Sequence, residues 1–153
     1  MEHPSPRTRT AAMDTVTDRL RSNLTGQPLL ATLGVEIVEL SRGRVVLDLP
    51  VRPEVTQQNG FVHAGAISTL ADAAAGAAAL SLMPEGKDVL SVEFKLNLLS
   101  PGVGERLRAT GTVVRSGRTI TVVGAEIRSV SGGIPGKEVA LLQGTMIAVE
   151  HTP

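Results

Sequence analysis

One segment, rich in Ala and Leu, constrains the fold of this chain more than any other. Helix-forming residues dominate from about Ala64 to Leu82, and the helix-breaking residues Pro84 and Gly86 follow. The pattern predicts one long helix that ends near residue 82. Because most of its side chains are apolar, this helix needs a sheet that wraps around it.

The segments on both sides of this helix have features typical of β-strands. Turn residues such as Ser116-Gly117 separate them, which favours hairpins and antiparallel pairing. A short helix over 14–24 precedes them all, and Gly26 and Pro28 stop it. The order predicts an α+β fold with a curved antiparallel sheet of about six strands. The expected strands are 33–40, 44–50, 89–99, 106–115, 119–130 and 138–150.

Length and composition limit the possible functions. A chain of 153 residues predicts one domain, over 13–153, after a polar, disordered tail over 1–12. The formal net charge of zero does not favour nucleic acid or an anionic membrane as a partner. Cysteine is absent, and the three histidines are scattered, so no metal site is expected. Without a spanning segment or a secretory signal, the protein is expected to be cytoplasmic.

Asp72 is the feature with the clearest chemical meaning. It lies inside the predicted helix, where Asp has poor propensity, and no Lys or Arg lies within one turn to pair with it. At helical spacing its face contains only small neighbours, namely Gly65, Thr69, Gly76 and Ala79. Such a face allows a ligand to approach a carboxylate, although a solvent-facing or capping role is an equal alternative.

His63 stands at the entrance of the same helix, nine residues before Asp72. Nine steps of about 100° put the two residues half a turn apart, on opposite sides of one helix. A site that uses both side chains would therefore draw them from two subunits. The free backbone N–H groups at this helix end, near Ala64 and Gly65, favour a developing negative charge.

The segment QQNGFVHAG over 57–65, followed by TLAD over 69–72, resembles the acyl-CoA thioesterases of the hotdog superfamily. The similarity is greatest to the PaaI-type branch and to the 4-hydroxybenzoyl-CoA thioesterase relatives. Their pattern has an amide residue, then His-Gly-Gly, then Leu-x-Asp, with nine residues from His to Asp. The segments SVEF over 91–94, Ser100-Pro101 and RSGR over 115–118 fit the following strands, so the resemblance covers about 29–150.

The resemblance implies a hotdog fold, hydrolysis of an acyl-CoA thioester without a cofactor, and homodimers that often pair into tetramers, with sites at the dimer interface. By position, Asp72 is the general base or nucleophile, and the backbone N–H of Ala64 polarises the thioester carbonyl. Gln57 takes the amide position and His63 orients the site. Ser91 helps to hold water or substrate.

Two departures from the family pattern leave points open. Ala64 replaces the first Gly of His-Gly-Gly, so its amide remains a donor without strain only if its φ angle is negative. The amide residue is Gln57 where this branch more often has Asn, and Asn59 is nearby. Arg115 and Arg118 are candidates for the phosphates of coenzyme A, although an exposed hairpin Arg is usually only solvated.

Two other functions remain open at this level. A hotdog domain can also serve as a non-catalytic acyl-CoA sensor or carrier, because a fold does not fix a function. A dehydratase of the same fold is a third reading, but its Asp and His pattern is not evident here.

Overall fold

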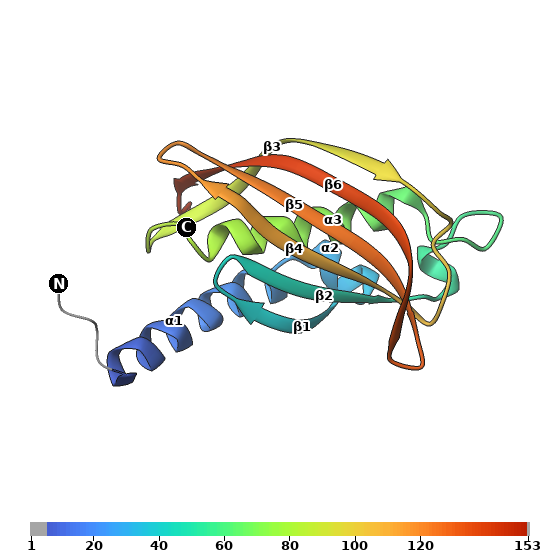
Figure 1. Cartoon of the computed structure of the whole chain (residues 1–153), viewed down its shortest axis with the longest axis horizontal. Helices are drawn as coiled ribbons and strands as arrows, with labels where there is room; N and C mark the ends of the chain where they lie inside the picture. Colours follow the sequence, from blue (N-terminus) through green and yellow to red (C-terminus); the bar gives the residue numbers. More distant parts are fainter. Residues whose placement is uncertain (1–5, 153) are drawn as a thin grey trace.

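A single six-stranded sheet forms the body of the molecule. The computed structural model describes residues 6–152, with side chains from residue 15 onward. All neighbouring strands are antiparallel, in the order β1-β2-β4-β5-β6-β3. Figure 1 shows the sheet curving along the long helix α3. The strands are β1 (Glu36–Ser41), β2 (Arg44–Pro50), β3 (Lys87–Leu98), β4 (Arg106–Ser116), β5 (Ile120–Ser131) and β6 (Ile134–Glu150).

The helix α3 (Ala64–Leu80) packs on the concave face of this sheet, as its apolar composition predicted. Leu70 and most of its alanines are fully buried, and they meet inward-facing side chains such as Leu47, Leu107 and Ile127. The predicted α+β fold, with a curved sheet of about six strands around one long helix, is confirmed.

Gly111 on β4 allows this helix to lie close to the sheet. A Cβ atom at this position would be 2.3 Å from the backbone carbonyl of Ala74 in α3. No side chain fits in that space, so the sheet can contact the helix backbone only at a glycine.

The N-terminal region differs from the sequence prediction in two ways. Helix α1 (Pro6–Thr25) begins well before residue 14, so residues 6–12 are helical rather than part of a tail, and residues 1–5 lie outside the described residues. Proline is favoured at the first position of a helix, which is where Pro6 stands.

A second helix, α2 (Pro28–Leu33), lies where the strand over 33–40 was expected to begin. Pro28 was read only as the end of the preceding helix, but it also starts the next one. Gly34, with a φ of 76°, ends α2, and the strand begins only at Glu36. A 3-10 turn (Pro53–Val55) then leads toward α3. Within the described residues, no helix is long and apolar enough to cross a membrane.

Candidate active site

Asp72 and Ser91 form a hydrogen-bonded pair between α3 and β3. Ser91 is paired with Met146, whose side chain is fully buried beneath the sheet, so both residues point toward the helix side. There the Ser91 hydroxyl donates to Oδ1 of Asp72 at 2.6 Å. Such a bond to a charged acceptor is short and strong. No hydrogen bond reaches Oδ2 of Asp72 from the described residues, so this oxygen is free to accept a proton.

His63 caps the N-terminus of α3 with its side chain. It has extended backbone angles, and its Nδ1 atom accepts a hydrogen bond from the N–H of Gly65 at 2.8 Å. An accepting Nδ1 carries no hydrogen, which assigns the ring hydrogen of a neutral imidazole to Nε2. A Cβ atom on residue 65 would lie 3.0 Å from this Nδ1, so glycine leaves room for the cap.

The capping bond selects between the two amides at the helix end. The N–H of Gly65 is used by His63, whereas the N–H of Ala64 makes no hydrogen bond within the described residues. Ala64 also has a negative φ, because no described residue other than glycine has a positive one. The strain that an Ala at this position could have caused is therefore absent, and one free donor remains at the positive end of the helix.

A tight turn over 57–60 presents the amide of Gln57 beside this helix end. The N–H of Gly60 donates to the carbonyl of Gln57 at 2.9 Å, and the N–H of Asn59 donates to the Gln57 side-chain oxygen. The turn thus uses the oxygen of the Gln57 amide and leaves its nitrogen available. Asn59 is exposed and lines no pocket near His63.

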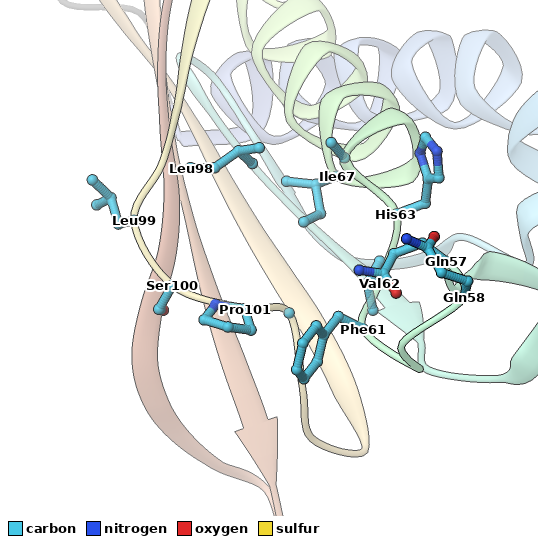
Figure 2. A pocket seen from close by; sticks show the side chains of 12 residues that line it. Gln57, Gln58, Phe61, Val62, His63, Ile67, Leu98, Leu99, Ser100 and Pro101 are labelled. Carbon is cyan, nitrogen blue, oxygen red and sulfur yellow. The ribbon is translucent and has the colours of Figure 1, made fainter.

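Gln57, His63 and Ala64 line one pocket of about 560 Å³. Figure 2 shows the side chains of Gln57 and His63 on one side of this pocket and those of Leu98 and Leu99 on the other. The geometry therefore combines a backbone donor, an amide and an imidazole N–H with an apolar wall. This combination suits the binding of a carbonyl group next to an apolar chain.

Asp72 and Ser91 line a different cavity, a groove of about 930 Å³ between α3, α1 and the start of β3. No residue lines both this groove and the pocket beside His63. Within one chain the carboxylate and the helix N-terminus therefore lie apart, as the half-turn offset between His63 and Asp72 indicated.

Three other candidate residues, Thr69, Arg115 and Arg118, do not line the groove of Asp72. The hydroxyl of Thr69 donates to the carbonyl of Gly65 at 2.9 Å, and Thr69 lines a smaller pocket beside His63. Arg115 and Arg118 are exposed around the connection of β4 to β5 and line none of the pockets described above. Thr121 of β5 pairs with Met146 of β6, which in turn pairs with Ser91 of β3. The connection between β4 and β5 therefore lies at the same end of the sheet as Ser91.

The sequence did not indicate that α1 lines the groove of Asp72. Arg19, Ser22 and Asn23 contribute to it from this helix. The apolar stripe with Leu20 and Leu24 could have indicated this role. These two side chains are buried against the core, so the α1 residues next to them lie at the edge of the surface that the helix covers. Among the described residues, no group of three potential metal-ligating side chains exists.

Comparison with known proteins gives one family match. The model of the "Thioesterase superfamily" matches residues 59–135, which includes Asn59, His63, Asp72 and Ser91. A putative esterase of Saccharolobus solfataricus is 32% identical over 107 residues, which span 70% of this chain and 76% of the relative. A 1,4-dihydroxy-2-naphthoyl-CoA hydrolase of Listeria monocytogenes is 30% identical over 61% of this chain and 76% of its own.

Solved structures agree with this match. A thioesterase family protein from Silicibacter pomeroyi is 42% identical, with a TM-score of 0.85 over 89% of this chain and 99% of the other. The PaaI protein of E. coli, from the phenylacetic acid degradation operon, has a TM-score of 0.79 over 92% and 98% of the two chains. At 22% identity, that second likeness concerns the fold alone.

Proposed function

The chain belongs to the thioesterase superfamily, and on this premise we propose that it hydrolyses acyl-CoA thioesters at a site centred on Asp72. The prediction of an enzyme of the thioester hydrolase class is confirmed by the family match and by the named relatives. The observation that carries the catalytic assignment is the contact of Ser91 with Asp72 at 2.6 Å, on a helix face lined by small residues.

In this mechanism Asp72 and Ser91 act on water or on the thioester carbon. As a general base, Asp72 takes a proton through Oδ2 while the water oxygen attacks the carbonyl. As a nucleophile, Asp72 attacks the carbonyl itself and forms a mixed anhydride, which water then cleaves. In both routes Ser91 fixes the carboxylate by donating to Oδ1.

The N-terminus of α3 stabilises the charge that develops on the carbonyl oxygen. The free N–H of Ala64 donates to this oxygen, and the helix dipole adds to the effect. His63 holds the first turn in place through its bond to Gly65, and the side-chain nitrogen of Gln57, on the same side of the pocket as His63, donates to the same oxygen. The departing CoA thiolate leaves toward solvent, where Arg115 and Arg118 are candidates to contact its phosphates.

In this proposal, Asp72 of one subunit and the N-terminus of α3 of a second subunit together form one active site across a dimer. Strand β3 is at the edge of the sheet, and its apolar side chains are exposed on both faces. An open edge with such side chains is a surface on which a second strand can pair. The side chains concerned are Leu90 and Val92, each 56% exposed, with Phe94, Leu98 and Leu99. Pairing of β3 with its symmetry mate brings a second helix N-terminus toward Asp72.

The test of Asp72 is hydrolysis of a panel of acyl-CoAs, followed by thiol release, for the wild type, Asp72→Asn and Asp72→Ala. We expect both variants to lose about 100-fold or more in kcat, because general base or nucleophilic catalysis contributes at least that much. Thermal unfolding should show that both variants are folded. Retained activity in both variants would exclude Asp72 from the chemistry, and binding without turnover in the wild type would favour an acyl-CoA sensor.

A single turnover in water labelled with ¹⁸O distinguishes the two roles of Asp72. If Asp72 is the base, the labelled oxygen enters the released acid in the first turnover. If Asp72 is the nucleophile and water then attacks the Asp72 carbon of the mixed anhydride, the first acid carries an oxygen from the carboxylate and the label is found in Asp72 by peptide mass analysis. Label in Asp72 therefore identifies the covalent route.

A further inference from the structure

The groove beside Asp72 continues well beyond the reacting atoms. Its floor is one side of α3, formed by Ala73, Gly76, Ala77 and Leu80. From Asp72 to Leu80 the helix rises about 12 Å, at 1.5 Å for each residue. The floor is therefore a continuous apolar strip that begins at the proposed catalytic carboxylate.

Helix α1 forms the facing wall, and Arg19 fixes it there. The guanidinium of Arg19 donates to the carbonyls of Met83 and Pro84, each at 3.1 Å, and to that of Lys87 at 2.5 Å. The first two carbonyls belong to the connection between α3 and β3, and Lys87 is the first residue of β3. One side chain thus joins α1 to both elements that border the groove, while Leu20 and Leu24 are buried in the core.

The chemistry of the groove is aliphatic at its floor and polar at its rim. Val89 and Val149 extend the apolar lining. Polar side chains of α1, such as Ser22 and Asn23, and charged side chains near the ends of β3 and β6, such as Lys87, Asp88 and Glu150, line the rest of the groove. The two aromatic residues of the chain, Phe61 and Phe94, do not line it. Stacking against an aromatic acyl group is therefore not available here, whereas a flexible chain can follow the floor.

We propose that this groove binds the acyl group of the substrate and that it accepts an unbranched aliphatic chain lying along α3 from Asp72 toward Leu80. The inference rests on the proposed function, because the thioester carbon must sit beside Asp72 for the chain to enter. A floor of about 12 Å accommodates about ten carbon atoms. Arg19 is a positioning residue, which acts by holding α1 as the wall of the groove.

The test compares straight-chain acyl-CoAs from acetyl to hexadecanoyl, together with benzoyl-CoA. For the wild type we expect kcat/KM to rise about fourfold with each added methylene up to about ten carbons, and then to level off. The variant Ala73→Leu places a bulky side chain on the floor next to the carboxylate. It should lower the ratio of kcat/KM for decanoyl-CoA to kcat/KM for acetyl-CoA by at least about tenfold.

Ala73→Ser is the matched comparison, since it changes the same residue without filling the groove, and it should keep more of the activity toward decanoyl-CoA than Ala73→Leu does. Arg19→Met tests the wall independently. It should raise KM for decanoyl-CoA more than KM for acetyl-CoA, whereas a general loss of structure would lower kcat for both substrates. Arg19→Lys should recover part of the effect, because a single ammonium group replaces only some of the hydrogen bonds of the guanidinium.

Each outcome decides a different point. If Ala73→Leu and Ala73→Ser show the same profile, or if benzoyl-CoA is preferred over decanoyl-CoA, the groove is not the acyl site, although a thioesterase remains. If the wild type hydrolyses no acyl-CoA, the proposed function fails. Calorimetric binding of decanoyl-CoA then still tests the groove, because binding by the wild type that Ala73→Leu abolishes supports it and equal binding by both overturns it.

Discussion

At the scale of single residues, Asp48 on β2 is a carboxylate that bears on stability, as Asp72 bears on the proposed catalysis. Its side chain is 1% exposed, and it accepts from Nε and Nη2 of Arg108 at 2.7 and 2.8 Å. Arg106 adds a contact at 3.3 Å and also pairs with Glu36. Burial alone would raise the pKa of Asp48, but the hydrogen bonds from Arg108 and Arg106 together hold it below its ordinary value.

This pair predicts a pH-dependent stability difference. A lowered pKa in the folded state means that the ionised Asp48 stabilises the fold above the unfolded pKa, near 4, and that this contribution is lost as the pH falls through the folded value. Asp48→Asn should lower the free energy of unfolding by about 1–3 kcal/mol at pH 7, because a buried acceptor loses charged donors.

Urea unfolding at several pH values measures this difference, which should shrink below about pH 4. Glu39→Gln, in the exposed pair of Arg44 with Glu39, is the control and should change stability by less than about 1 kcal/mol. A constant difference from pH 7 to pH 3 would show that the charge of Asp48 does not contribute.

At this scale, the sequence predicted the placement of individual residues better than it predicted their hydrogen-bond partners. The alternation over 44–50 placed Asp48 on the face opposite Leu47, which is where it lies. Its partner Arg108 is 60 residues away, and only the pairing of β2 with β4 brings them together. In the same way, the motif indicated His63 as a site residue, but it did not indicate that the His63 ring would accept a hydrogen bond from the N–H of Gly65.

At the scale of elements, the contact of α3 with β4 depends on Gly111. The variant Gly111→Ala would place a methyl group within the backbone of α3, so the helix must move off the sheet. We expect it to lower the free energy of unfolding by about 3 kcal/mol or more. Gly124→Ala is the matched control, because its Cβ would make only ordinary contacts, at 3.6 Å or more, and chemical denaturation of the two should differ clearly.

Periodicity predicted the elements well where one face is buried. The range 44–50 coincides with β2, and the predicted helix over 64–82 differs from α3 by two residues at its end. It failed for α2, which has six residues and too few turns to show a helical pattern. It also gave no strand order, because β6 is inserted between β5 and β3 by contacts that no local pattern encodes.

At the scale of the whole molecule, the proposed dimer and the separation of Asp72 from the pocket of His63 within one chain together predict complementation between inactive subunits. Dimers of Asp72→Asn and of Gln57→Ala should each be nearly inactive. When they are unfolded and refolded together, half of the dimers are mixed and each has one intact site of two, so about a quarter of wild-type activity should return.

The control is a mixture of the same two proteins without unfolding, which should stay inactive if subunits do not exchange. Sedimentation measures the dimer directly. Activity that stays absent after refolding, in proteins that sediment as dimers, would mean that each site is built from one chain.

The position of β3 also has a consequence for the order of events during synthesis. A ribosome makes β3 before β6, the strand with which it pairs, so the apolar side chains from Leu90 to Leu98 emerge without a neighbour while β4 and β5 are made. An unpaired apolar strand is a site of aggregation. The exposure ends only when β6 has been made, so the nascent chain is most open to aggregation before this last hairpin forms.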